Sequence, residues 1–597
     1  MSARRALADR PNRRLLTAQR RPGGESDEPT PAPPRAPVPV RLPPIPPAPP
    51  AETTGTPPWP DLLNRTPAVT VESGRLIRAL TFSYVAGNDS GAIAHAFDTA
   101  PIAESSFEPE CFFEELFVDE LLRGCMSVQL AGKPVRTHTR YLMRLLSQPP
   151  ADPRVREQRT AVWRALEAST AVRVAVTEVF SALTELFHLF TGEDQISLRG
   201  EQTRRRIEIL RLIQRCFAAL EAPELGAADS CLHRLPSFAA HVAATPAFAH
   251  LQELLKYENE RAYADLTLQF GADGRVRGLR VVGVREDTRN RYHVPKLKQW
   301  LGRFGLWFRG FRVDDGEIID RWLDQVFDEI VEFLPPLVQL SGDLEWYLSG
   351  LAFRDACLAR GLPVCFPTWV DASEPGHLSG FFNPLLFALG VTPVTCEVDL
   401  NGWGVTTLIT GPNSGGKTRL LQAVGLLQLC AQAGMFVPAA AARVRPVPGL
   451  FASLSQPAGA EQSEGRLGTE LKRIRMLFER AEPGTLVLVD ELCSGTSPSE
   501  GEELFRLVLE LLHELEPVAL ISTHFLRFAA DLAADPENSL PLRFIRVELD
   551  ASQRPTYRFG GGVAETSLAQ QTAARLGVTR EELRAVLAGK RRSVTST

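Results

Sequence analysis

The sequence predicts an α/β domain at the C-terminal end of the chain, preceded by a mainly α-helical region that carries a small β insert. Short apolar runs at 407–410, 486–489 and 518–522 each end in polar side chains, which is typical of buried parallel strands that bring site residues to one sheet edge. Farther upstream, apolar residues recur at three- and four-residue spacing over long stretches, which is typical of packed amphipathic helices.

The run Thr407–Thr410 leads into the sequence GPNSGGKTR, which fits the pattern G-x-x-x-x-G-K-[ST]. Backbone N–H groups of such a turn, at the start of a helix, bind phosphates. Lys417 is expected to reach the β- and γ-phosphates of ATP, and the Thr418 hydroxyl to ligate Mg²⁺. The alternative is a glycine-rich turn before an ordinary helix. The expected nucleotide contacts are Gly411, Pro412, Asn413, Ser414, Gly415, Gly416, Lys417, Thr418 and Arg419.

Two further apolar runs complete the predicted ATPase site. Leu486–Val489 ends in Asp490, expected to orient the Mg²⁺ shell, and Glu491, expected to orient or deprotonate the attacking water. Val518–Ser522 brings His524 to the same edge, where a neutral imidazole can hold the γ-phosphate. An isolated Asp–Glu pair is usually a solvated strand end, and an isolated histidine is usually structural. Three strand ends in this order favour ATP binding and hydrolysis.

Several motifs together resemble the ATPase domain of the MutS family of DNA mismatch-repair proteins. The segments TGPNSGGKT, AGMFVPA, LVDELCSGTSPSEG and STHF stand in the order that this family shows. FNPLLF precedes the loop, and GGVAETSLAQQTAARLGV (Gly561–Val578) is similar to the family's C-terminal helix-turn-helix region. Upstream, Thr139–Glu167 is similar to the start of the MutS core domain.

The resemblance implies an ABC-type ATPase whose two ATP sites are completed in trans within a homodimer. It also implies helical lever arms that close on mismatched, branched or nonspecific duplex DNA in repair or recombination. The implied domains are a disordered tail at 1–68, a core and lever region at 69–380 with a clamp-like insert near 265–310, and the ATPase domain with its dimerisation region at 381–597. Action on ribosomes or another ribonucleoprotein, as in some MutS paralogues, is one alternative. A scaffold with a structural nucleotide is another.

The chain departs from the family pattern at the position of the trans element and at the adenine-stacking position. Ser463–Leu477 occupies the place of the trans element, but an ordinary connector and surface helix would also fit; its candidates are Ser463, Gly465 and Thr469. The aromatic residue that stacks on adenine in the family is missing, and Val394 stands near its place.

The parts of the family that read mismatches or cut DNA are not expected here. The pattern Phe-x-Glu of the mismatch wedge occurs in Phe112–Glu115, but its helical setting favours a buried helix. We expect neither the N-terminal mismatch-recognition domain nor a nuclease tail.

Composition limits where nucleic acid can bind. A net charge of −5, with 23% charged residues, requires a local basic patch. The proline-rich tail carries an arginine-rich beginning, which is either a solvated tail or a nonspecific phosphate contact. The predicted hairpin insert is basic with interleaved aromatic residues, which suits phosphate and base contacts or a solvated face over core tryptophans. Its residues are Arg275, Arg277, Arg280, Arg285, Arg289, Arg291, Lys296, Lys298, Tyr292, Trp300 and Trp307.

Cysteine spacing and hydropathy predict the compartment. The nine cysteines form no C-x-x-C pair, which indicates neither a zinc site nor a disulfide framework and fits a reducing cytosol. We find no apolar run of the roughly 18 residues that a membrane span needs, and no signal-peptide core. We therefore expect a cytoplasmic protein without membrane contact.

Overall fold

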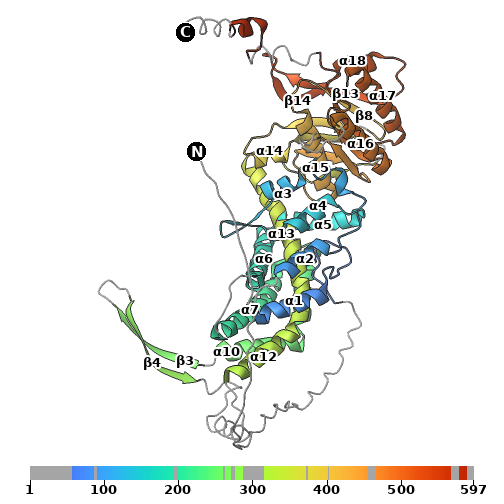
Figure 1. Cartoon of the computed structure of the whole chain (residues 1–597). Coiled ribbons are helices and arrows are strands. Elements are labelled where there is room, and N and C mark those ends of the chain that lie inside the picture. Colours follow the sequence, from blue (N-terminus) through green and yellow to red (C-terminus); the bar gives the residue numbers. More distant parts are fainter. Residues whose placement is uncertain are drawn as a thin grey trace, which may run out of the picture. The chain divides into compact units, whose positions relative to one another are not determined.

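In the computed structural model the described residues are 57–86, 90–191, 199–259, 262–270, 276–286, 315–371, 374–400, 402–454, 465–565, 577–585 and 587 (Figure 1). All of them belong to one unit, Pro57–Thr597. The structure of residues 1–56, and therefore the predicted disorder there, lies outside this description.

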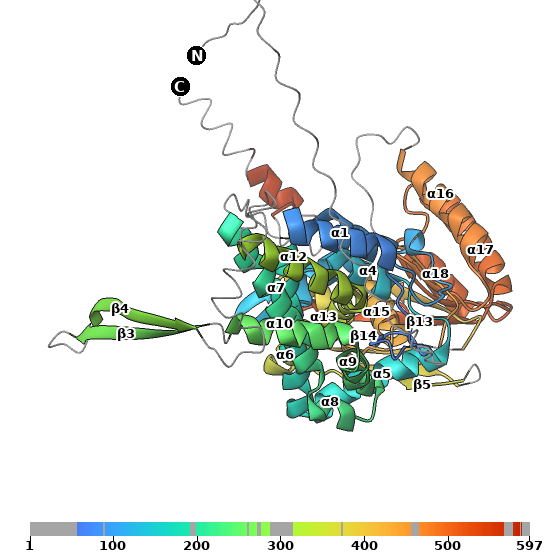
Figure 2. The same cartoon turned by 90° about the horizontal axis from the view of Figure 1, so that it is seen from below.

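Helices dominate the part of the chain before residue 360, as the apolar spacing predicts. Helices α1, α6, α7, α10, α12 and α13 pack side by side (Figures 1 and 2). The bounds are α1 (Ser73–Ala86), α2 (Ser90–Thr99), α3 (Val118–Cys125), α4 (Thr139–Ser147), α5 (Pro153–Ala168), α6 (Thr170–Thr191), α7 (Arg199–Leu220), α8 (Pro223–Ala227), α9 (Arg234–Ala243), α10 (Pro246–Asn259), α12 (Asp315–Ile330) and α13 (Leu334–Ala359).

Helix α5, in the segment that resembles the start of the MutS core, and helix α13 both begin as local rules predict. The Asp152 side chain accepts the backbone N–H of Arg154 and caps α5, and Pro153 occupies the first helical position. In the same way, Pro335 and Pro336 lie in the first turn of α13, where proline is tolerated. These prolines therefore mark the start of a helix.

Helix α6 is a partial exception to the expectation about membrane spans. By length and hydropathy, Thr170–Thr191 is apolar enough to cross a membrane, and half of its most apolar window is buried inside the fold. It packs against α7 and α13, which is the position of a core helix.

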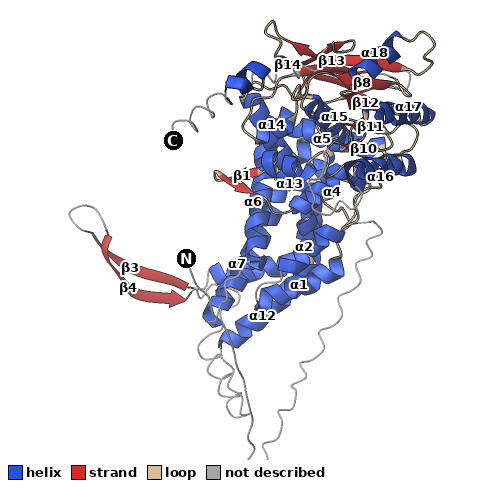
Figure 3. Ribbon diagram, turned by 45° about the horizontal axis from the view of Figure 1, so that its top comes forward, coloured by secondary structure: helices blue, strands red, loops and turns tan. Residues whose placement is uncertain are grey.

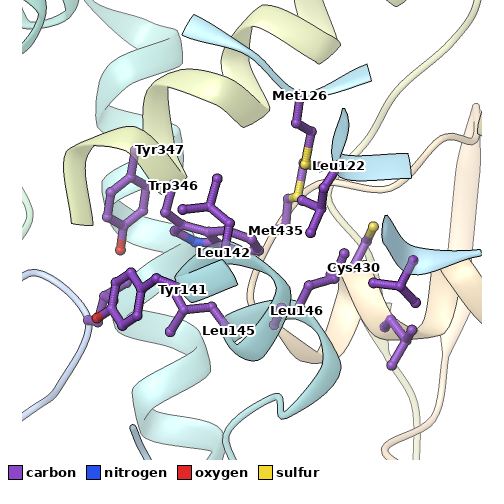
Figure 4. Packing of buried hydrophobic residues seen from close by; sticks show 14 of the residues in the cluster. Leu122, Met126, Tyr141, Leu142, Leu145, Leu146, Trp346, Tyr347, Cys430 and Met435 are labelled. Atoms are coloured by element: carbon purple, nitrogen blue, oxygen red, sulfur yellow. The ribbon is translucent and has the colours of Figure 1, made fainter. Parts of the chain in front are cut away.

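One hydrophobic core runs from the helices into the ATPase part. Figure 4 shows Tyr141 and Leu145 of α4 beside Trp346 of α13, with Cys430 of α15 (Lys417–Gln432) and Met435, just beyond that helix, nearby. All five side chains are buried. The helices and the elements of the C-terminal part are therefore continuously packed.

The C-terminal part contains a six-stranded sheet in the order β10-β11-β12-β8-β13-β14 (Figure 3). Its first five strands are parallel and β14 is antiparallel to β13. The predicted strands at 407–410, 486–489 and 518–522 are confirmed as neighbours. The bounds are β8 (Thr406–Thr410), β10 (Leu450–Ser453), β11 (Leu486–Val489), β12 (Val518–Thr523), β13 (Leu542–Leu549) and β14 (Pro555–Gly561). The accompanying helices are α15 (Lys417–Gln432), α16 (Gly465–Arg480), α17 (Pro498–Glu514) and α18 (Leu526–Ala534).

A second sheet has the order β5-β9-β6-β7. Its strands are β5 (Thr368–Trp369), β6 (Gly376–Phe381), β7 (Cys396–Leu400) and β9 (Ala441–Val444), with the short helix α14 (Pro384–Ala388) between β6 and β7. The domain boundary expected at residue 380 falls inside β6. Because β6 pairs with β7 and β9, residues 376–380 belong structurally with the C-terminal part.

The segment 57–68, expected to belong to the proline-rich tail, is instead packed. Leu62 is fully buried, its backbone N–H donates to Asp343, and its carbonyl accepts the Tyr347 hydroxyl at 3.0 Å. The Asp61 carboxylate accepts the N–H groups of Leu63 and Asn64. These are tertiary contacts, which the local composition does not reveal.

Leu62→Ala is expected to lower the free energy of unfolding by about 2–5 kcal/mol, because a fully enclosed leucine leaves a cavity. Thr66→Ala, at an exposed position of the same segment, is the control and should change stability by less than about 0.5 kcal/mol. Chemical denaturation measures both. Equal stability of the two variants would show that the segment is not anchored.

The predicted hairpin and the wedge-like motif have separate outcomes. Strands β3 (Ala262–Phe270) and β4 (Val276–Glu286) pair antiparallel, so the hairpin is confirmed. Its turn, its side chains and residues 287–314 lie outside the described residues. Phe112–Glu115 follows a 3₁₀ turn (η1, Pro109–Cys111) and precedes α3, so the helical setting was wrong. Phe112 is nevertheless fully buried, as core packing requires.

Candidate nucleotide-binding site

The glycine-rich loop joins β8 to α15, as the sequence predicts. Gly411 has φ 143° and Gly416, the N-cap of α15, has φ 91°. Both angles are in the region that favours glycine. At Gly411 a Cβ atom would also lie 2.6 Å from Val547, so both the backbone angle and the lack of space require glycine. The loop therefore presents backbone N–H groups at the start of a 16-residue helix.

The Lys417 side chain is buried inside the loop. Its ammonium group donates to the carbonyl oxygens of Gly411 at 3.0 Å and Pro412 at 3.5 Å, and the side chain is 5% exposed. Burial lowers the pKa of Lys417, although Glu491 and Asp490 oppose that shift. A phosphate oxygen carries a negative charge and would bind the Lys417 ammonium group more strongly than these two neutral carbonyl oxygens do.

Asp490 lies between two hydroxyl groups at the end of β11. Thr418 of α15 donates to one carboxylate oxygen, and Ser522 of β12 donates to the other. The Asp490 backbone N–H donates to Ser453 on β10 at 2.9 Å. Thr418 and Asp490, the two residues predicted to act on Mg²⁺, are thus in contact in the structure. Ser522 was missed, although the register that pairs Val489 with Ile521 places it opposite the acidic pair.

Glu491 follows directly and lines the same cavity as the loop. Its backbone N–H donates to the Ser522 hydroxyl at 3.0 Å. Its φ is 52°, and three other non-glycine residues that line this cavity also have positive φ: Phe117 (54°), Ser414 (67°) and Tyr557 (60°). Such conformations cost energy and persist where the surroundings fix them, which is frequent at functional sites.

His524 stands one residue after β12, at the expected sheet edge. Its side chain is exposed, lies against the ring of Phe525, and is not among the residues that line the cavity. A role for His524 at the γ-phosphate stays a prediction.

The loop opens into a cavity of about 700 Å³, a size suited to a small ligand. All nine expected nucleotide contacts except Gly411 line it. The loop and the acidic pair form a polar part of its lining. Another part is apolar and aromatic and includes Val394; sequence reasoning did not assign its main members to the site: Phe117, Phe381, Phe382, Leu386, Cys396, Tyr557 and Phe559.

Tyr557 reaches the cavity through long-range pairing. Strand β14 pairs with β13, and the backbone carbonyl of Tyr557 accepts the Cys396 thiol of β7 at 3.2 Å. Its ring is half exposed and would lie 3.3 Å from a side chain built on Gly416. A flat aromatic face is thus available beside the helix start.

The candidate trans segment is described only from residue 465 onward, so Ser463 lies outside the description. Thr469 lies in α16 beside Glu470. The Glu470 carboxylate accepts the Ser494 hydroxyl at 3.1 Å and the Gly495 N–H at 3.2 Å. Helix α16 therefore holds the loop that follows the acidic pair within its own chain.

Asn383, in the segment FNPLLF, links this neighbourhood to the phosphate-loop helix. Its side-chain oxygen accepts the N–H of Leu385 and caps α14, while its amide donates to the Arg419 carbonyl at 2.9 Å. This contact fixes α14 against the first turn of α15.

Residues 407–579 match the family described as MutS domain V. The C-terminal part of this chain is a MutS domain V. It is a phosphate-loop α/β domain with a mixed sheet, preceded by a helical region, and it belongs to a family of ATPases that bind ATP.

Relatives with the name Endonuclease MutS2 are similar over part of the chain. The protein from Thermomicrobium roseum is 33% identical over 274 residues, which is 44% of this chain and 33% of the relative. The protein from Thermus thermophilus is 31% identical over 278 residues, which is 46% of this chain and 35% of the relative. The protein from Gemmatimonas aurantiaca is 35% identical over 279 residues, which is 46% of this chain and 33% of the relative. The match thus spans about a third of each relative's length.

Most of the predicted helix-turn-helix region, Gly561–Val578, lies outside the described residues, since these do not include residues 566–576. The dimerisation role given to this region stays a prediction.

Proposed function

We propose that the MutS domain V of this chain binds and hydrolyses ATP with Mg²⁺, and that this cycle opens and closes the helical arms around mismatched or branched DNA. The observation that carries the ATPase part is the placement of Asp490 between the hydroxyls of Thr418 and Ser522, beside the loop lysine. The loop lysine, the hydroxyl suited to Mg²⁺ and the acidic pair lie at one sheet edge, which is the arrangement that phosphoryl transfer uses.

The residues at the loop fit a magnesium ion. Mg²⁺ is usually held by one or two carboxylates, a hydroxyl and phosphate oxygens. Thr418 and Asp490 supply the hydroxyl and the carboxylate, already in contact. When bound, the ion would neutralise charge on the phosphates. Glu491, on the same cavity wall, is then the residue that would orient and deprotonate water.

The coupling to DNA is supported by family membership of the ATPase part and by the continuous core that joins it to the helices. Closure would follow dimerisation around nucleotide, with each site completed by a second copy. The Endonuclease MutS2 relatives are named for a nuclease activity, and the third of their length matched here supports only the ATPase part of the proposal.

The test measures ATP turnover in the presence of different candidate partners. Phosphate release from ATP is measured with Mg²⁺ and with chelator, in the presence of plain duplex, mismatched duplex, four-way junction or ribosomes. The proposal expects Mg²⁺-dependent turnover that junction or mismatch DNA changes more than ribosomes do. Turnover that responds to ribosomes alone would show that the partner is a ribonucleoprotein and not DNA. Absence of turnover would contradict the proposed ATP hydrolysis.

Tyr557 is proposed to stack on the adenine base, replacing the aromatic residue that is missing near Val394. Tyr557→Ala is expected to weaken ATP binding by about 5- to 150-fold, since stacking on a base is worth about 1–3 kcal/mol. Affinity for tripolyphosphate should stay unchanged, and Tyr557→Phe should bind ATP as the natural protein does. Calorimetric titration measures all three. Equal losses for ATP and tripolyphosphate would rule out base stacking.

A further inference from the structure

A second groove lies away from the nucleotide site, between the helical region and the second sheet. Its volume is about 670 Å³, and its walls come from α5, α8 and the segment around β5. Small apolar residues form much of the floor. They are Ala161, Ala165, Ala168, Val172, Ala227, Ala228 and Pro367.

Two arginines of α5 line this groove, and each lies over an aromatic ring. The Arg156 guanidinium lies 3.8 Å from the centre of the Trp369 ring, and that of Arg164 lies 5.2 Å from the centre of the Phe366 ring. Stacking of this kind fixes the plane of a guanidinium while its N–H groups point along the plane. The two side chains differ in burial, since Arg156 is 6% exposed and Arg164 is exposed.

The Arg156 side chain is buried without full use of its donors. Its Nε is enclosed and has no hydrogen-bond partner among the described residues. A buried cation without its hydrogen bonds is costly, and the usual remedy is an oxyanion that accepts two N–H groups at once. The buried, incompletely paired arginines Arg159 and Arg445 are not among the residues that line this groove.

Three carboxylates also line the groove. Glu157 lies on α5 next to Arg156, whereas Glu224 lies on α8 and Asp229 follows that helix. In the part of the chain that the structure describes, no ion pair joins any of the three to Arg156 or Arg164. A ligand that fills the groove therefore meets cationic donors on α5 and carboxylate acceptors on and after α8. Its chemistry must include an oxyanion, an apolar or planar body, and a hydrogen-bond donor.

We propose that this groove is a second ligand site, and that it takes a small phosphate ester of about mononucleotide size whose phosphate is bound by Arg156 and Arg164. The carboxylates of Glu224 and Asp229 would accept hydrogen bonds from an amino group of the ligand. The site adjoins the phosphate-loop helix, because the Thr160 hydroxyl donates to the carbonyl of Gly434, just beyond α15, at 2.9 Å. The proposal does not depend on ATP hydrolysis.

The test uses AMP and inorganic phosphate as probes, with the ATP site first saturated by a non-hydrolysable ATP analogue and Mg²⁺. Calorimetric titration of the full chain is expected to give one further site for AMP and weaker binding of phosphate. Arg156→Met, which keeps the apolar contact with Trp369, and Arg164→Gln should each weaken AMP binding at least about tenfold. Arg78→Gln, at an exposed position on α1, is the matched control and should bind AMP unchanged.

Each other outcome decides against the proposal. Unchanged AMP binding in both Arg156→Met and Arg164→Gln would place the second site elsewhere. Absence of a further site at millimolar AMP would make the Arg156 and Trp369 contact a purely structural one. Binding of citrate with no binding of either phosphate probe would overturn the assigned ligand class. Because Arg164 is exposed, its variant reports on the site even if Arg156→Met unfolds.

Discussion

Glu491→Gln is expected to bind ATP normally and to hydrolyse it about 10²- to 10⁴-fold more slowly, the range that a general base contributes. The carboxylate lines the cavity next to Asp490, and its backbone is held by Ser522 in a strained conformation with φ 52°. Glutamine keeps the shape and removes the proton acceptor. Steady-state phosphate release and equilibrium binding of a fluorescent ATP analogue measure the two effects separately.

A matched control is available on α17. Glu503→Gln removes an equivalent charge at an exposed position and should leave turnover unchanged. If Glu491→Gln turns ATP over at the natural rate, another group activates the water. If it also loses ATP affinity, Glu491 acts in binding, and the assigned role is wrong.

Lys417→Ala is expected to weaken ATP binding by about 10- to 150-fold, since hydrogen bonds to charged groups are worth about 1.5–3 kcal/mol. The ammonium group now donates to Gly411 and Pro412 within the loop and would transfer to phosphate oxygens. Calorimetric titration with ATP measures the loss. Lys133→Ala, at an exposed position on β2 (Lys133–Val135), is the control. Undiminished affinity in Lys417→Ala would contradict the phosphate-binding role of the loop.

The pH dependence of this interaction has a defined sign. Burial lowers the pKa of Lys417 below the ordinary value of 10.5. The unfolded chain therefore binds this proton more tightly than the folded chain, so the buried charge lowers stability at neutral pH, and the penalty is relieved as pH rises. Phosphate binding needs the charged form. As the pH rises, ATP affinity should thus begin to fall at a lower pH than it would if the loop lysine had the ordinary pKa of an exposed lysine.

The phosphate end of the site could be predicted from the sequence because it depends on short-range patterns. The loop follows a strand and starts a helix, and Asp490 and Glu491 end an apolar run, so local order alone places them. Parallel pairing of β8, β12 and β11 then brings these ends to one edge. Ser522 was not assigned to the site because a small polar residue at the end of an apolar run gives no specific local signal. Only the register with β11 reveals its contact with Asp490.

The base end could not be predicted, since its residues are far apart in the chain. Tyr557 arrives because β14 pairs with β13, which in turn pairs with β8. Phe117 and Phe381 come from the helical region and the second sheet. The packed segment around Leu62 was missed for a related reason: its composition resembles the proline-rich tail, and contacts with distant elements hold it, among them α13, Arg159 of α5 and Arg234 of α9.

The central claim is tested most directly by a crystal structure of Glu491→Gln with ATP and Mg²⁺. The account predicts an intact γ-phosphate beside Lys417, a metal ion ligated by Thr418 and positioned by Asp490, and adenine against Tyr557. A metal ion remote from Asp490, or a triphosphate bound away from the loop between β8 and α15, would contradict it.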